Sequence, residues 1–525
     1  MRIRGVLGVT GLLVAGAIAS PALAENKAER RGVFMADHGL CEGDECRWCT
    51  FAAPVRRAAD HNQRLLRGGA PVAEVEPNDS PAQAQVLDVG TNPGQPNNLL
   101  VDAAFNSSGE DDWFQVTLNA GDTMIVYADG GVNGDTQIRL EFSDGSFLQF
   151  AEDESGVSNI FPPDTPFPVA PVSGTFNALL YFPVPITGTY NFRLTEFSDN
   201  TYPYQLNIGI FRSLTESSPG RIQKFFIDFD GETITPSQIW GFGNSSPSFQ
   251  PGFATFLPNW GVDPSRESDL IDGILDVVVE NLEDVRALNP NFQYELLNSR
   301  DDPDTFGIDP DVSRVIVGGS IASSGINTIG IAEFIDPGNY SLDDTAIVLL
   351  DLLSDPSFFN PSNYGPGFTV EDWIELVVGN IVTHEFGHYI GHIHTDTFNS
   401  TPAIMDAGGN LDFTIGAVGP DGLYGTADDG DSDFVADEFQ GGFFLTGTEF
   451  VDFATAFNLS GAASGCPGDA DGDGDTTTAD ITFIVSNLGA GSPGAQGTPG
   501  DVDGNGLTTT ADITLAVSNL GCTTP

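Results

Sequence analysis

The chain has 525 residues, and 74 Asp and Glu against 19 Lys and Arg give it a formal net charge of −55. A surface with that charge repels phosphate backbones and anionic lipid headgroups, which argues against nucleic acid as a partner. Hydrophobic residues make up 40% of the chain, enough for several ordinary cores, so wholesale disorder is excluded. At roughly 100 to 200 residues per domain, the length predicts three or four domains.

Residues 1–24 have the pattern of a secretory signal peptide. Arg2 and Arg4 precede an apolar stretch from Gly5 to Ala19, and Ala22-Leu23-Ala24 fits the small-x-small pattern before a cleavage site. An uncleaved anchor is the alternative, but roughly 15 apolar residues fall short of the ~20 that a membrane-spanning helix needs. We therefore expect a secreted or cell-surface protein whose mature chain has no membrane span.

A basic leader or propeptide is expected over residues 25–70, which include Cys41, Cys46 and Cys49. Export permits disulfides, and an odd number of cysteines leaves one thiol without a partner in the segment. A free thiolate could block the open position of a metal until the leader is removed. The alternative is a local disulfide with one spare thiol.

Residues 71–212 alternate apolar and polar side chains in short runs separated by Gly, Asn and Asp, which predicts an antiparallel β-sandwich. The expected strands are 111–118, 123–129, 136–143, 188–196 and 204–211. The segment resembles the bacterial pre-peptidase C-terminal (PPC) domain in Glu76-Pro77-Asn78-Asp79, in Asp111 to Phe114, in DTQIRL at 135–140 and in Gly188-Thr189-Tyr190. Such domains accompany secreted proteases, usually after the catalytic domain, whereas this one precedes it. A spacer or surface-binding role without chemistry is expected.

Residues 219–462 mix strand and helix patterns, which predicts an α+β domain. The expected strands are 221–231, 313–319, 326–334 and 345–351, and the expected helices are 268–288 and 369–383. Thr369, followed three residues later by Asp372, has the pattern of a helix N-cap. The second helix leads directly into the histidine-rich segment of the chain.

Residues 384–394 read HEFGHYIGHIH and contain four of the six His of the chain. His384 and His388 lie one turn apart on one face of the predicted helix, and imidazoles at this spacing can chelate one Zn²⁺. Gly391 can end the helix because glycine adopts the left-handed conformation, and the resulting bend would return His394 as third ligand. The sequence therefore predicts a three-histidine zinc site.

Three neutral histidines leave a fourth position for water, whose pKa zinc lowers toward neutrality. Glu385 is then predicted to act as general base, taking the proton of the water and later delivering it to the leaving amine. His392, four residues after His388, is an alternative third ligand if the helix continues straight through Gly391. A Glu as third ligand is a further alternative.

The motif His-Glu-x-x-His-x-x-Gly-x-x-His, together with Met405 in TPAIMDAGG, resembles that of the metzincin zinc endopeptidases. The resemblance implies a mixed sheet, an active-site helix and an irregular C-terminal subdomain whose Met-turn lies beneath the metal. It also implies an edge strand that binds the substrate backbone, for which 326–334 is the candidate. Ala407 stands where some metzincins have a metal-binding Tyr, so tyrosine assistance is not expected.

Residues 469–489 recur at 501–521, and each copy carries oxygen ligands at the spacing of a calcium loop. Gly474 and Gly506 occupy the sharply turning sixth position. Each loop is predicted to hold one structural Ca²⁺, about two in all. The predicted ligands are Asp469, Asp471, Asp473, Asp475 and Asp480 in the first loop, and Asp501, Asp503, Asn505, Leu507 and Asp512 in the second, where Asp475 and Leu507 contribute carbonyls.

Residues 464–525 resemble a type I dockerin, a small α-helical module like an EF-hand, and the resemblance implies docking to a cohesin-like domain. A calcium-stiffened tail without a partner is the alternative. Cys466 and Cys522 bracket the repeat and are predicted to form a disulfide. The acidic loop at 419–439 is either a further calcium site or a solvated loop.

These patterns together predict a multidomain, secreted zinc endopeptidase that acts on protein or peptide substrates. An all-β sandwich would precede its α+β metzincin-like domain, and a dockerin-like module would follow it. The alternative is a non-catalytic surface or assembly protein with a structural zinc site. Glu385 discriminates between the two, because a structural site needs no base beside its ligands.

Overall fold

The computed structural model describes residues 71–89, 97–131, 134–152, 161–162, 176–197, 200–212, 222–289, 291–309, 311–356, 359–407, 416–441, 445–459, 470, 476–490, 500, 502, 507–518 and 520–521. The predicted signal peptide and leader, with their cysteines, lie outside these residues. None of the described helices is long and apolar enough to span a membrane.

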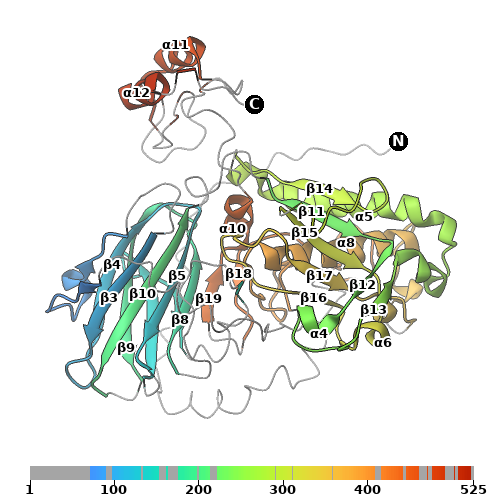
Figure 1. Cartoon of the computed structure of the whole chain (residues 1–525), viewed down its shortest axis with the longest axis horizontal. Helices are drawn as coiled ribbons and strands as arrows, with labels where there is room; N and C mark the ends of the chain where they lie inside the picture. The colour runs from blue at the N-terminus through green and yellow to red at the C-terminus, as the bar shows by residue number, and fades with distance from the viewer. Residues whose placement is uncertain are drawn as a thin grey trace.

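Two stacked β-sheets form one side of the molecule (Figure 1). The first sheet has the order β1 (Val72–Ala73), β3 (Asn97–Ala104), β10 (Pro203–Arg212), β5 (Asp122–Asp129) and β8 (Leu179–Pro183). The second has the order β18 (Asp437–Glu438), β19 (Leu445–Glu449), β7 (Phe147–Ala151), β6 (Thr136–Phe142), β9 (Gly188–Glu196), β4 (Asp112–Leu118) and β2 (Gln85–Val86). The 3₁₀ segment η2 (Pro81–Gln83) precedes β2.

The core of this sandwich comes from the alternate side chains that the strand pattern predicts. Val116, Leu140 and Phe192 of the second sheet share one buried cluster with Met124 and Ile208 of the first. All five predicted strands are confirmed, as β4, β5, β6, β9 and β10. Except for β1/β3 and β2/β4, neighbouring strands in both sheets run antiparallel.

The sandwich is not confined to residues 71–212. Strand β19 pairs antiparallel with β7, with Leu445 opposite Ala151 and Gly447 opposite Gln149. The neighbouring strand β18 pairs with β19 at the edge of the same sheet. A segment that follows the histidine motif therefore completes a sheet built mainly from residues far upstream.

A mixed five-stranded sheet forms the other side of the molecule (Figure 1). Its order is β14 (Glu295–Asn298), β11 (Lys224–Asp228), β15 (Val312–Val317), β17 (Thr345–Val348) and β16 (Gly330–Ala332). Neighbouring strands run parallel except for β16, which is antiparallel to β17 and forms one edge. This sheet contains the four strands that the sequence predicts for the region, and β14 in addition.

Alternate residues of these strands face two different cores, as the period of a strand requires. Val315 and Val317 share a core with the helices α5 (Glu267–Asp284) and α8 (Val370–Tyr389). Ile316 and Ile347 instead pack with Trp240 on the other face. The two long helices pack against each other and cover one face of the sheet.

Short elements complete this part of the chain. They are β12 (Gly231–Ile234), α4 (Pro236–Ile239), β13 (Ser248–Pro251), η5 (Phe253–Thr255), η6 (Leu257–Trp260), η7 (Pro264–Arg266), η8 (Val285–Leu288), α6 (Ile321–Ser324), α7 (Leu350–Leu353), η9 (Pro361–Asn363) and α10 (Val451–Asn458). The tail contributes α11 (Thr478–Ser486) and α12 (Thr510–Ser518), which contact each other.

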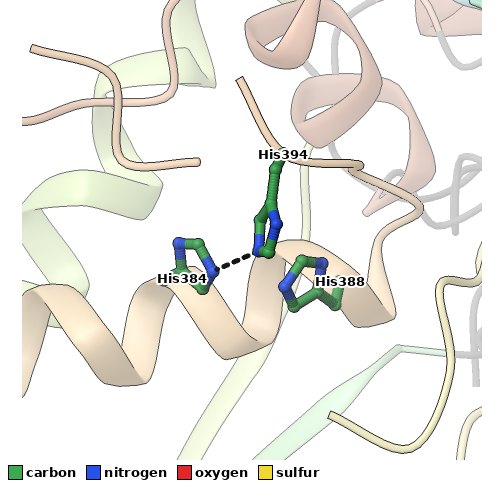
Figure 2. Close-up of side chains that lie close together, drawn as sticks. All are labelled: His384, His388 and His394. Carbon is green, nitrogen blue, oxygen red and sulfur yellow. Dashed lines mark hydrogen bonds between the residues drawn. The ribbon is translucent and has the colours of Figure 1, made fainter. Parts of the chain in front are cut away.

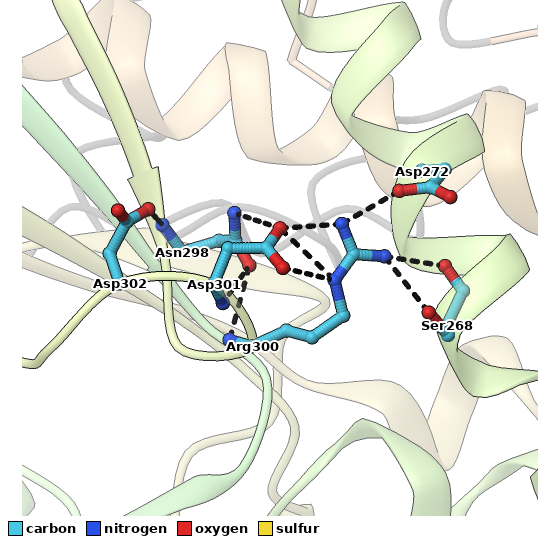
Figure 3. A network of polar contacts seen from close by, with 6 residues as sticks. All are labelled: Ser268, Asp272, Asn298, Arg300, Asp301 and Asp302. Atoms are coloured by element: carbon cyan, nitrogen blue, oxygen red, sulfur yellow. Dashed lines mark hydrogen bonds and ion pairs between the residues drawn. The ribbon is translucent and has the colours of Figure 1, made fainter.

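A polar network around Arg300 joins the turn after β14 to the first turns of α5 (Figure 3). Its guanidinium lies 2.7 Å from the carboxylate of Asp272 and 2.5 Å from that of Asp301, and Nη1 donates to the carbonyl of Ser268 at 2.7 Å. These carboxylates are largely exposed, so each ion pair contributes at most about 1 kcal/mol to stability. The network orients the helix, while the buried core supplies most of the stability.

Candidate metal centre and active site

Helix α8 begins where the sequence predicts. Thr369 Oγ1 accepts from the backbone N–H of Asp372, and the Asp372 carboxylate accepts from the N–H of Thr369, so the cap satisfies two otherwise unpaired donors. The helix ends at Tyr389, and Gly391 has a left-handed φ of 103°. The bend that the motif requires is therefore present.

The three predicted zinc ligands come together at this bend (Figure 2). His384 and His388 project from one face of α8, and the chain beyond Gly391 brings back His394. Ligand nitrogens of the three side chains lie within 4.8 Å of one another, and the Nε2 atoms of His384 and His394 are 3.3 Å apart. All three imidazoles are buried.

The tautomers of two ligands follow from their backbone contacts. The Nδ1 atom of His384 lies 2.7 Å from the carbonyl oxygen of Ile404, and that of His388 lies 2.9 Å from the carbonyl oxygen of His392. A carbonyl only accepts, so each Nδ1 carries the proton and each Nε2 offers its lone pair. Second contacts of this type orient histidines that bind metal ions.

The site fits Zn²⁺ in donor type and spacing. Tetrahedral ligands at Zn–N distances of about 2.0–2.1 Å lie about 3.3 Å from one another, which is the separation of the two Nε2 atoms of His384 and His394. Burial lowers the pKa of His384 to about 4 and the pKa values of His388 and His394 well below the usual range. All three imidazoles are therefore neutral near pH 7, as metal ligands must be.

Glu385 directly follows His384 on α8 and is buried. Among the residues that the structure describes, neither of its carboxylate oxygens has a hydrogen-bond partner, and burial raises its pKa well above the usual range. A Cβ atom added to Gly330 would lie 2.0 Å from Glu385 Oε1, so edge strand β16 passes next to this carboxylate. The predicted edge strand and the predicted base are thus in contact.

Met405 packs against the helix between the two α8 ligands. A Cβ atom added to Gly387 would lie 2.2 Å from Met405 Sδ. The carbonyl of Met405 accepts from the N–H of Thr395 at 2.9 Å, and the carbonyl that His384 contacts belongs to the preceding residue, Ile404. The segment around Met405 therefore contacts His384, and Thr395 next to His394, through its backbone carbonyls.

The alternative in which His392 is the third ligand is wrong. Its Nε2 atom lies 2.7 Å from Thr455 Oγ1, and the Thr455 hydroxyl donates its one proton to the carbonyl of Val451 at 3.0 Å. The imidazole must therefore donate from Nε2, and the imidazoles whose nitrogens gather within 4.8 Å of one another are those of His384, His388 and His394. The helix also ends before Gly391, so the straight geometry assumed by this alternative does not occur.

The structure describes only part of the predicted calcium loops. Asp480 Oδ1 accepts from the N–H of Ala470 at 2.7 Å, and Asp512 Oδ1 accepts from that of Val502 at 2.9 Å, so the two repeats have the same internal contact. Both carboxylates are buried, and Leu507 is half-buried. The remaining predicted positions lie outside the described residues: Asp469, Asp471, Asp473, Asp475, Asp501, Asp503, Asn505, Cys466 and Cys522.

Other carboxylate groups gather close enough to hold a cation, and the sequence analysis missed most of them. One lies in the acidic loop at 419–439, where Asp421, Asp428 and Asp429 approach within 4.8 Å of one another. Another joins α5 to a later part of the same loop. Two further groups, which share Glu76, lie at the start of the sandwich. The last three groups are Glu280 with Asp431 and Asp433; Glu74 with Glu76 and Asp112; and Glu76 with Asp79 and Glu110.

Asp112 is the buried member of the sandwich group. Its Oδ2 atom accepts from the hydroxyl of Tyr204 at 2.7 Å, but burial, together with the charges of Glu74, Glu110 and Glu76, raises its pKa to about 8. The sequence indicates this carboxylate group only through the acidic run EVEPND at 74–79. The proximity of this run to Asp112, at the start of β4, follows from the fold.

This carboxyl predicts a pH dependence of stability in buffer free of divalent cations. The pKa of Asp112 in the folded protein lies above its ordinary value of 3.8, so protonated Asp112 contributes fully below about pH 4, and the contribution is lost as pH rises toward about 8. Asp112→Asn should therefore gain melting temperature relative to wild type as pH rises across this range, measured by calorimetry. The neighbouring Asp111→Asn is the control, and a pH-independent difference for Asp112→Asn would contradict the prediction.

No family model and no curated protein matches the chain. Among solved structures it is similar to the periplasmic g-type lysozyme inhibitor PliG of Aeromonas hydrophila, at 11% identity and a TM-score of 0.15, over 24% of this chain and 95% of that one. It is also similar to the pre-peptidase C-terminal domain of Bacillus anthracis collagenase, at 7% identity and a TM-score of 0.17, over 26% of this chain and 99% of that one. Likenesses at these TM-scores carry no argument about fold or function.

Proposed function

We propose that the protein is a zinc-dependent endopeptidase. One observation carries the proposal: three buried imidazoles converge within 4.8 Å, and the residue after the first of them, Glu385, is a buried carboxylate that has no hydrogen-bond partner among the described residues. A structural zinc site needs its ligands alone, whereas a hydrolytic site also needs a base next to the metal. The proposed site contains both.

The histidines and Glu385 would have different chemical roles. His384, His388 and His394 would hold the metal, which supplies a Lewis acid that lowers the pKa of water and polarises a carbonyl. Glu385 would take a proton onto its carboxylate and return it to the leaving amine.

Strand β16 supports a peptide as the substrate class. It forms the edge of the mixed sheet, pairing with β17 through Gly330, Ile331 and Ala332. Backbone groups on the outer side of an edge strand can bind an extended peptide by strand addition. Because Gly330 lies against Glu385, a peptide bound there would pass beside the base.

Replacing Glu385 by Gln tests the proposal. The variant should bind zinc with wild-type stoichiometry while hydrolysis of a quenched peptide library falls by about 100-fold or more, because the amide cannot accept the proton. Zinc content and turnover are measured on the same sample. Glu375→Gln, earlier on the same helix, should keep wild-type turnover.

Wild-type turnover in Glu385→Gln would contradict the assignment of the base. Zinc that is bound by wild-type protein without any peptide hydrolysis would favour the second candidate function, a surface or assembly protein with a structural metal. A buried Glu385 with no hydrogen-bond partner among the described residues has no role in that second candidate, which is why the hydrolase is preferred.

The tail is proposed to bind two Ca²⁺ ions and to dock to a cohesin-like domain, with a calcium-stiffened tail as the alternative. The matching contacts of Asp480 and Asp512 support two equivalent loops. Each carboxylate also accepts from a backbone N–H at the start of its helix, Thr477 in one repeat and Thr509 in the other. Export of the protein, inferred from residues 1–24, supplies the calcium-rich surroundings that such loops require.

Calcium removal should loosen the tail. In EGTA, limited proteolysis should cut after residue 464, because acidic loops without their cation repel internally. Added Ca²⁺ should restore resistance and added Zn²⁺ should not. A double variant, Asp480→Asn with Asp512→Asn, should be cut with or without calcium. Equal resistance of the wild-type tail in EGTA and in calcium would contradict the loop assignment.

A further inference from the structure

The turn at residues 390–394, which carries His394, packs against the β-sandwich. Ile393, the residue before this ligand, is fully buried and belongs to the same hydrophobic cluster as the sandwich core. Phe439 and Leu445, which flank the connection from β18 to β19, belong to that cluster too. The third proposed zinc ligand is therefore adjacent in sequence to a residue of the sandwich core.

Backbone hydrogen bonds continue this connection. The N–H of Gln440 donates to the carbonyl of His394 at 3.0 Å, and the N–H of Asp396 donates to the carbonyl of Glu438 at 2.9 Å. Thr395 forms an antiparallel bridge with Phe439 between these two bonds. Since β18 pairs with β19 and β19 pairs with β7, backbone pairing runs without interruption from the His394 turn into the sandwich sheet.

Glu449, at the end of β19, holds the same turn from the other side. Its side chain is completely buried, and Oε1 accepts from the N–H of Ile393 at 3.0 Å. The same oxygen lies 3.8 Å from His392 Nδ1. An apolar residue in its place would leave the buried N–H of Ile393 without its acceptor, which is costly in a dry interior.

Helix α10, which follows Glu449, forms two hydrogen bonds with residues of the turn that come before Ile393. Thr455 accepts from His392 Nε2 at 2.7 Å, and Asn458 Nδ2 donates to the carbonyl of Ile390 at 2.7 Å. Residues 390–394 are thus held by β19, α10 and the sandwich core together. His392 serves in this arrangement as a buried support.

We propose that the β-sandwich is part of the zinc site and that Glu449 is a positioning residue for His394. This inference rests on the proposed function only in its choice of zinc as the metal. It replaces the expected spacer role of the sandwich with a direct mechanical one, because the sheet fixes the backbone on both sides of the ligand. Zinc affinity should therefore depend on residues that never touch the metal.

The test measures zinc affinity of the full chain by competition with a chromogenic chelator. Glu449→Leu removes the acceptor at similar volume and should weaken zinc binding by about tenfold or more. Glu449→Gln keeps a side-chain oxygen for the N–H of Ile393 and should retain wild-type affinity. Phe114→Leu is the matched control, because β4 lies four strands away from β19 in the same sheet and the variant weakens only the core.

Three outcomes would overturn the positioning role. They are wild-type zinc affinity in Glu449→Leu, a loss in Glu449→Gln equal to that in Glu449→Leu, or a loss in Phe114→Leu as large as that in Glu449→Leu at the same fall in melting temperature. Should Glu449→Leu fail to fold, Ile393→Ala takes its place with the same expected loss. Wild-type protein that binds no zinc would overturn the proposed function as well, whereas the three outcomes above leave it standing.

Discussion

The proposed active site depends on one backbone bend, at Gly391. Its φ of 103° turns the chain back after α8, so that His394 reaches the two histidines of the helix. A side chain at this position would be strained by the left-handed conformation, and its Cβ would also lie 2.5 Å from Pro337 Cα. The close approach matters because the N–H of Asp336 donates to the carbonyl of His388 at 2.9 Å. The bend thus fixes a ligand and the end of the helix together.

Burial gives the site its electrostatic character. The three imidazoles are neutral because a dry environment disfavours their charged forms, and the same environment raises the pKa of Glu385. Burial therefore keeps the lone pairs of the three imidazoles available for a dication. The chain supports this arrangement through two backbone carbonyls, from Ile404 and His392.

Local patterns in the sequence predicted the parts of the fold that local chemistry determines. Alternating side chains identified β4, β5, β6, β9 and β10, and the spacing of His384, His388 and His394 identified the histidine cluster of the proposed metal centre. Strand β8 was not predicted because its sequence, LLYFP, contains no charged or amide side chain to mark an alternation. The pairing of β19 with β7 could not be predicted, because both strands are short and their partnership joins distant parts of the chain. The supporting role of His392 depends on Thr455 and Glu449 and is equally invisible in the sequence.

X-ray absorption at the zinc edge, on the processed and zinc-loaded protein, tests the proposed centre most directly. We predict three imidazole nitrogens at about 2.0–2.1 Å and a remaining position filled by solvent oxygen, as a hydrolytic site requires. A fourth imidazole or a thiolate sulfur bound to the zinc would leave no position for the reacting water. That result, or a processed protein that retains no zinc, would contradict the assignment.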